Sequence, residues 1–207
     1  MAYAAWLNPN KTSGSGNDTV SISALADNTG RNARTTNVTF KAANCPDVVR
    51  AVSQRGKPEF VSIESAKSVA NNGVAALTIT GTSNSSKLTF SLASGGTLSL
   101  TLPSTYIANS VQTNNGEAIA GDAGATAEFV FSITFTNIPA NTSVSALTAQ
   151  LIVTDNAGNE STCTITQAAG DATLDVSPNS LTLDWDAYTQ SSSASFTVTS
   201  NTNWTVE

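Results

Sequence analysis

The residues best suited to cation binding lie together in one turn that contains glycine. Asp155, Asn156, Asn159 and Glu160 offer carboxylate and amide oxygens, the ligands that Ca²⁺ prefers. Their spacing does not match an EF-hand loop, although a cation site remains conceivable. Asp, Asn and Gly between two alternating apolar segments are more typical of a hairpin turn. The sequence therefore favours a turn, and we expect no bound metal and no other cofactor.

A second group of side chains could contact sugars. Asp184, Trp185, Asp186 and Tyr188 combine aromatic rings, which stack on sugar faces, with carboxylates, which accept hydrogen bonds from hydroxyl groups. Trp185 and Tyr188 are thus possible glycan contacts. The alternative is a strand end with one aromatic residue in a core, and the sequence favours this alternative.

The side chains that most enzymes need for acid–base and nucleophilic chemistry are missing. The chain has no His, which removes the commonest general base and the commonest metal ligand. Serine is abundant, but no Gly-x-Ser-x-Gly motif is present. Glu117, Asp122 and Glu128 lie in or near a loop predicted for residues 114–127, without the aromatic cleft of a glycosidase. We therefore expect no catalytic residues and no enzymatic activity.

Composition restricts the partners. The 207 residues are 40% hydrophobic, enough for a packed core, but only 12% charged, against about 25% in a typical domain. A net charge of −6 with nine Lys and Arg argues against nucleic acid as a partner. No apolar run approaches the length of about 18 residues that a membrane span needs. Residues 1–6 lack the basic and apolar regions of a secretory signal, so we expect synthesis in a cytoplasm.

Alternation of apolar and polar residues runs through most of the chain. This period of two is typical of β-strands, and the abundance of Thr and Val supports strands over helices. Many short strands separated by Asn- and Gly-containing turns predict an all-β protein built from sandwiches. The clearest strand candidates are 19–24, 37–40, 48–53, 76–80, 87–92, 97–102, 128–135, 149–154, 180–185 and 194–199.

An internal repeat divides the chain. Residues 52–56 and 165–170 match each other as closing strands with a shared Gln and Gly, and each is followed by a segment that opens a new sandwich. Residues 58–170 are therefore predicted to form one complete immunoglobulin-like sandwich. Residues 1–57 are predicted to be the back part of another sandwich, and residues 171–207 its front part.

The two terminal segments carry a recognisable series of short motifs when the C-terminal one is placed first. In that order they are Asn201-Thr202-Asn203-Trp204, Trp6-Leu7, Ser13-Gly14-Ser15-Gly16, Asn28 with Arg34-Thr35-Thr36, and Gln54-Arg55-Gly56. This series resembles the BACON domain, an immunoglobulin-like sandwich common in Bacteroidetes proteins. The resemblance implies tandem immunoglobulin-like sandwiches in which the terminal domain is split between the two ends of the chain.

Each half of a split sandwich should expose apolar residues that the other half covers. The predicted contact residues are Trp6, Val20, Ile22 and Phe40 in the first half, and Leu181, Leu183, Phe196, Val198, Trp204 and Val206 in the second. The halves could join within one chain or between chains, or they could be truncated or independently stable half-domains. Short connections at residues 57–58 and 170–171 favour joining between chains, because a few residues cannot span a whole sandwich.

The resemblance also suggests a setting. BACON-like and immunoglobulin-like modules occur in virion proteins of phages that infect Bacteroidetes, and such proteins need no signal peptide. The first hypothesis is therefore a structural protein of a bacteriophage virion, of the capsid-decorating, auxiliary or head-fibre type. It would be made in the host cytoplasm and would bind copies of itself or capsid proteins. The alternative is an adhesion module that binds carbohydrate or mucin. Neither nucleic acid nor a membrane is expected as a partner.

Overall fold

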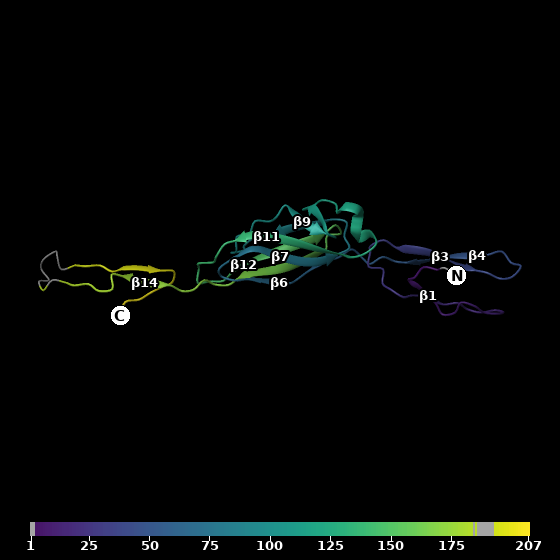
Figure 1. Ribbon diagram of the computed structural model, residues 1–207, viewed down its shortest axis with the longest axis horizontal. Coiled ribbons are helices and arrows are strands. Elements are labelled where there is room, and N and C mark those ends of the chain that lie inside the picture. The colour runs from purple at the N-terminus through teal and green to yellow at the C-terminus, as the bar shows by residue number, and fades with distance from the viewer. Residues whose placement is uncertain (1–2, 184, 186–192) are drawn as a thin grey trace.

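The computed structural model describes residues 3–183, 185 and 193–207. It is almost entirely β-structure, as the alternation predicts. Figure 1 shows three parts in a row: an N-terminal segment at one end, a sandwich in the middle, and a C-terminal segment at the other end. We call residues 1–57 the N-terminal segment, residues 58–170 the middle domain and residues 171–207 the C-terminal segment.

The first sheet of the middle domain has five strands in the order β10-β9-β11-β7-β5. All of its pairings are antiparallel, and the longest joins β7 to β11. The strands are β5 (Val61–Ile63), β7 (Val74–Ser83), β9 (Thr105–Ala108), β10 (Val111–Asn114) and β11 (Phe129–Ile138).

The second sheet has four strands in the order β6-β13-β12-β8. Its β12 pairs antiparallel with both neighbours, whereas β6 pairs parallel with β13 at the edge. The strands are β6 (Ala66–Val69), β8 (Leu88–Leu92), β12 (Leu147–Asp155) and β13 (Glu160–Gln167).

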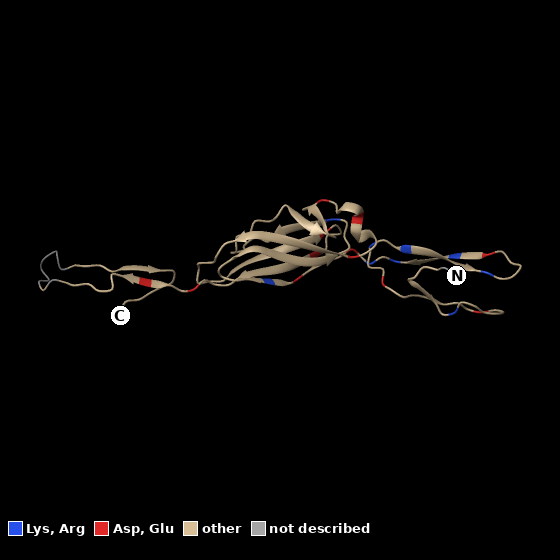
Figure 2. Ribbon diagram, viewed as in Figure 1, with Lys and Arg blue, Asp and Glu red and all other residues tan. Residues whose placement is uncertain are grey.

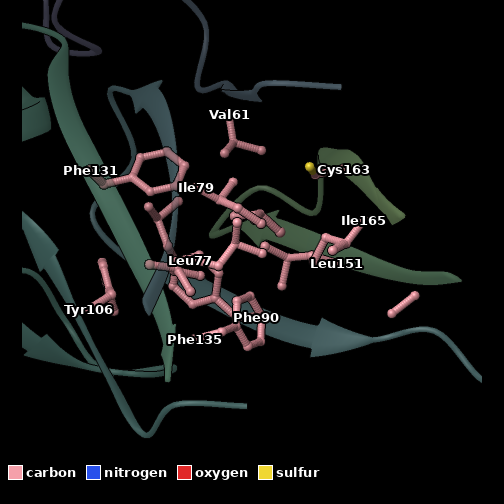
Figure 3. Packing of buried hydrophobic residues seen from close by; sticks show 14 of the residues in the cluster. Val61, Leu77, Ile79, Phe90, Tyr106, Phe131, Phe135, Leu151, Cys163 and Ile165 are labelled. Carbon is pink, nitrogen blue, oxygen red and sulfur yellow. The ribbon is translucent and has the colours of Figure 1, made fainter. Parts of the chain in front are cut away.

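The two sheets enclose a continuous apolar core (Figure 3). Alternate residues of β11 point inward, so Phe131, Ile133 and Phe135 are each only 1% exposed. Phe90 joins the sheets, because its ring lies edge-on to those of Tyr106, at 4.7 Å between centroids, and Phe131, at 6.0 Å. The middle domain therefore has the packed interior of a complete sandwich.

Three details differ from the sequence expectation. Residues 97–102, predicted to be a strand, form none, because the amides of Thr97 and Leu98 both donate to the Thr148 carbonyl, at 2.8 and 2.9 Å. Residues 180–183, the described part of the strand predicted over 180–185, form none either.

The segment predicted as a plain loop contains a short 3₁₀ helix, η1 (Ala120–Ala125), in which Gly121 and Asp122 have positive φ angles of 70° and 46°. The helix begins with a hydrogen bond from the Asp122 amide to the carbonyl of Ile119, 3.1 Å long. Because alanine and glycine give no periodic hydrophobic pattern, a helix of this length cannot be recognised from the sequence. No helix in the described part of the chain is long and apolar enough to cross a membrane.

The terminal segments consist of separate hairpins. The N-terminal segment pairs β1 (Leu7–Pro9) with β2 (Ile22–Ala24), and β3 (Arg34–Phe40) with β4 (Val48–Gln54). The C-terminal segment pairs β14 (Leu174–Ser177) with β15 (Thr197–Ser200). Each is a sheet of two strands, and such an isolated ribbon is at best marginally stable in water. Among the described residues, these strands pair with no strand of the middle domain.

Candidate functional site

A buried asparagine ties the N-terminal segment to the middle domain. Asn84 follows β7 and is fully buried. Its Nδ2 donates to the carbonyl oxygens of Thr29, Lys57 and Pro58, at 3.3, 3.1 and 3.2 Å. Its Oδ1 accepts a hydrogen bond from the amide of Phe60, at 3.0 Å. One side chain thus holds the last turn of one segment against the first strand of the next.

The same arrangement recurs where the middle domain meets the C-terminal segment. Asn201 follows β15, and its Nδ2 donates to the carbonyl oxygens of Thr142 and Asp171, at 3.1 and 2.8 Å. Its Oδ1 accepts from the amide of Thr173, at 2.8 Å. The preceding Ser200 donates to the Thr173 carbonyl at 2.8 Å, as Ser83 does to the Phe60 carbonyl at 2.7 Å. The two junctions therefore share one hydrogen-bond plan.

A second pair of asparagines repeats on the other side of each junction. Asn28 is 8% exposed and Asn141 is 6% exposed. Each side-chain amide donates to the carbonyl four residues later and to the carbonyl 27 residues later. Equal spacing, equal burial and equal partners place these two side chains at the same point of two related domains.

Strand register repeats in the same way. Pairing of β14 with β15 sets Leu174 opposite Ser200, as pairing of β5 with β7 sets Val61 opposite Ser83. Pairing of β3 with β4 ends on Gln54, as pairing of β12 with β13 ends on Gln167. The C-terminal segment thus corresponds to the front of the middle domain, and the N-terminal segment corresponds to its back.

Positions that are buried in the middle domain are open in the terminal segments. Ile138 at the end of β11 is 4% exposed, whereas Leu25, just before Asn28 as Ile138 is just before Asn141, is 63% exposed. Val153 on β12 is 0% exposed, and Phe40 at the corresponding place on β3 is 40% exposed. The difference arises because β2 and β3 belong to sheets of only two strands, whereas β11 and β12 lie in sheets of five and four strands. These faces are the candidate functional surface.

All ten predicted contact residues lie in the described part of the chain. Five of them are half-buried, namely Trp6, Val20, Ile22, Leu181 and Val198. The other five are exposed, namely Phe40, Leu183, Phe196, Trp204 and Val206. Sequence reasoning missed further exposed apolar residues, which are Leu25, Val48, Val49, Leu174 and Val176. Alignment of the internal repeat could have identified Leu25, because Leu25 aligns with the buried Ile138.

The N-terminal segment contains a groove next to its open face. A cavity of about 330 Å³ lies between the β1–β2 hairpin and β3, and Val20, Val38 and Phe40 line it. At its rim, Lys11 Nζ lies 2.7 Å from Asp18 Oδ1. The hydrogen bond from Lys11, with a second from the backbone, lowers the pKa of Asp18. The groove thus has an apolar floor and a charged edge.

Charge is divided unequally between the two segments (Figure 2). The N-terminal segment carries seven Lys and Arg against three Asp and Glu. The C-terminal segment carries five Asp and Glu and neither Lys nor Arg. Opposite net charges favour contact between the two segments over contact of either with its own kind.

Trp6, a predicted interface residue, and Trp185, a predicted glycan contact, have different surroundings. Trp6 is half-buried, and the Arg34 guanidinium carbon lies 4.8 Å from its ring centroid, a cation–π distance. Trp185 is 94% exposed. The other members of the predicted sugar-binding group, which are Asp184, Asp186 and Tyr188, lie outside the described residues.

The carboxylate oxygens of Asp155 accept hydrogen bonds from within their own turn. Asp155 Oδ1 accepts hydrogen bonds from the amides of Ala157 and Asn159, at 2.8 and 2.9 Å. Its Oδ2 accepts from Asn159 Nδ2, at 2.8 Å. This is the hairpin turn that the sequence favours. Within the described residues, no cluster of three or more His, Cys, Asp or Glu side chains is placed to hold a metal ion.

Comparison with known proteins finds a family match for the N-terminal segment. Residues 1–55 match the model of the BACON family, described as "Putative binding domain, N-terminal". The match ends within one residue of the end of β4, and it confirms the BACON resemblance for the N-terminal segment. A search of curated proteins finds no match to the chain.

Proposed function

We propose that this chain, whose residues 1–55 match the BACON binding-domain family, is a non-enzymatic structural protein that binds other copies of itself. The C-terminal segment of one copy would complete the sandwich begun by the N-terminal segment of another. The observation that carries this proposal is the repeated junction. The equivalent hydrogen bonds of Asn84 and Asn201 support the proposal that the terminal segments are complementary parts of one kind of domain.

Joining between copies is favoured over closure within one chain. The two segments lie at opposite ends of the molecule, with the whole middle domain between them (Figure 1). Each is held at its own end by side-chain hydrogen bonds, through Asn84 at one end and Asn201 at the other. Closure within one chain would require breaking at least one of these junctions, whereas a second copy can approach either end freely.

Completion of the sandwich would be favourable for two reasons. Full burial of one large apolar side chain contributes about 1.5–3 kcal/mol, and Phe196, Trp204 and Val206 are each about half exposed or more. Pairing would also satisfy the backbone groups of open strand edges, which otherwise invite unspecific aggregation. The opposite charges of the two segments would speed encounter in the correct orientation.

Two blocked variants test the proposal. Phe40→Asp places a charge on the open face of the N-terminal segment, and Val198→Asp places one on the C-terminal segment. Each variant alone should be monomeric by mass photometry. An equimolar mixture should form dimers, because the Phe40→Asp chain retains an unchanged C-terminal segment and the Val198→Asp chain retains an unchanged N-terminal segment. Val130→Asp is the matched control, since Val130 is 63% exposed on the middle domain and should not alter assembly.

Far-ultraviolet circular dichroism of each variant would show that the middle domain still folds. A parent chain that stays monomeric at micromolar concentration would contradict the proposal. Blocked variants that assemble like the parent would contradict it as well.

The biological setting that we propose is a bacteriophage virion, where the chain would be a capsid-decorating, auxiliary or head-fibre protein. The BACON resemblance and the self-assembly proposed above support this setting. Mass spectrometry of phage particles purified on a density gradient tests it. Peptides from residues 58–170 should be found in intact particles at many copies per particle, and their absence from particles would remove this setting.

A second candidate function is carbohydrate binding, favoured by the 94% exposure of Trp185. An exposed tryptophan ring is free to stack, and its flat apolar face suits the apolar face of a sugar. Immobilised mucin should retain the protein, and Trp185→Ala should abolish retention. Tyr3→Ala offers an aromatic control at the opposite end of the chain. Equal retention of parent and Trp185→Ala would exclude this residue as the contact.

A further inference from the structure

We infer the pairing register of the completed domain: β15 of one copy lies antiparallel to β2 of the next, with Phe196 opposite Val20. We infer further that this contact builds an open, polar filament of domains. The inference rests on the proposed self-assembly and specifies which strands meet.

The middle domain shows where β15 must go. Its equivalent, β7, pairs with β5 on one edge and with β11 on the other. In the C-terminal segment, β15 pairs with β14 on the first edge, and no described strand lies along the second. The strand that should occupy this edge is the equivalent of β11. In the N-terminal segment that equivalent is β2, since β2 ends shortly before Asn28 as β11 ends shortly before Asn141.

The two asparagine landmarks set the register. In the middle domain, Ile79 lies opposite Ile133. The spacing from Ile79 to Asn84 equals the spacing from Phe196 to Asn201. The spacing from Ile133 to Asn141 likewise equals the spacing from Val20 to Asn28. Phe196 and Val20 are therefore at positions equivalent to those of Ile79 and Ile133.

This register is chemically consistent. Ile79 and Ile133 are each 1% exposed and lie in the core. Their equivalents are also apolar, and neither is buried in the single chain, since Phe196 is 51% exposed and Val20 is half-buried. A slip by one residue would turn every side chain of β15 to the wrong face, so one register is strongly preferred.

The polarity follows from the junctions. Asn84 and Asn201 make equivalent contacts, so each domain is placed on its predecessor in the same way. A contact between different surfaces, repeated by one operation, gives an open filament unless the rotation closes a ring. The end-to-end arrangement in Figure 1 favours extension over closure.

Cysteine cross-linking of the full chain tests the register. The background is Cys45→Ser, because Cys45 is exposed, whereas Cys163 is buried. Val20→Cys with Phe196→Cys should give a ladder of disulfide-linked multimers on a non-reducing gel. The control is Val20→Cys with Val198→Cys, a diagonal pair that should be about 7–8 Å apart, beyond the usual reach of a disulfide.

A second pair guards against loss of the Phe196 side chain. Ile22→Cys with Ala194→Cys joins the next positions on the same face, and it keeps the side chains of Phe196 and Val198. A ladder from either matched pair, and not from the diagonal control, supports the inference.

The outcomes separate the register from the function. Multimers under reducing conditions without a ladder from either matched pair overturn the register and leave self-assembly standing. A ladder from the diagonal control alone also overturns it. A monomeric parent chain overturns the proposed function itself. Negative-stain electron microscopy tests whether the assembly stays open, because unbranched filaments support an open filament and closed rings overturn it.

Discussion

Asn28 and Asn141 occupy the same place in two successive domains of one chain. Each is nearly buried, and the amide of each bridges two backbone carbonyls, with shorter bonds of 2.7 and 2.8 Å. A buried amide that lost these partners would be costly, so the asparagines define the shape of each domain end. Because both ends are built alike, the middle domain serves as a template for the domain that the terminal segments can form together.

Replacing the junction asparagines should separate stability from assembly. Asn84→Ala removes several buried hydrogen bonds and should lower the free energy of unfolding by about 2–4 kcal/mol. Asn201 is exposed in the single chain, so Asn201→Ala should cost less than about 1 kcal/mol but weaken assembly. Urea unfolding in the Val198→Asp background and mass photometry in the parent background measure the two effects. Equal losses of stability would contradict the assignment.

Salt should slow assembly. The basic N-terminal and acidic C-terminal segments attract each other through exposed charges, which added salt screens. The initial rate of light scattering should therefore fall between low and high sodium chloride. Asp175→Asn on β14 should weaken this dependence, whereas Glu117→Gln on the middle domain should not. A rate that rises with salt would indicate that apolar contact alone drives association.

The two cysteines should differ sharply in reactivity. Cys45 is exposed, whereas Cys163 is 0% exposed in the core, where burial and then nearby Glu64 raise the pKa of its thiol. The thiolate is the reactive form, so a maleimide should label one thiol per native chain and two after unfolding in urea. Cys45→Ser should abolish native labelling. Native labelling of that variant would show that the core opens.

Alkaline pH should destabilise the middle domain through Tyr106. Burial raises the pKa of Tyr106 from 10.0 to about 12. A raised folded pKa gives stability that is complete below pH 10 and is lost as pH rises through about 12, at most about 2–3 kcal/mol in total. Chemical unfolding at pH 9 and pH 11.5 measures the loss. Tyr106→Phe should show a smaller loss, and an unchanged one would exclude this group.

A weak acid effect should come from Glu64. The hydrogen bond from Lys67, with a second from the Thr80 amide, lowers the pKa of Glu64. A lowered folded pKa gives stability that is present above the unfolded value near 4.5 and is lost as pH falls through the folded value. Because the pair is partly exposed, Glu64→Gln should cost less than about 1 kcal/mol at pH 7 and nothing at pH 2. An equal cost at both values would contradict this origin.

Much of the fold could be predicted from local pattern. Alternation in residues 128–135 predicted a strand, and β11 carries Phe131, Ile133 and Phe135 in the core. The hairpin turn at Asp155 followed from its residue types, which satisfy their own backbone. The helix η1 could not be predicted, because Ala and Gly carry no periodic signal over so few residues.

The sequence by itself determined most of the strands and the repeat, because period-two alternation and turn residues act over a few neighbours. Only the tertiary structure decided which of the alternating faces are closed. Leu25 and Ile138 precede equivalent asparagines, yet one is 63% exposed and the other 4%. Burial depends on whether a second sheet lies opposite, and that is a property of distant parts of the chain and of its neighbours rather than of local sequence.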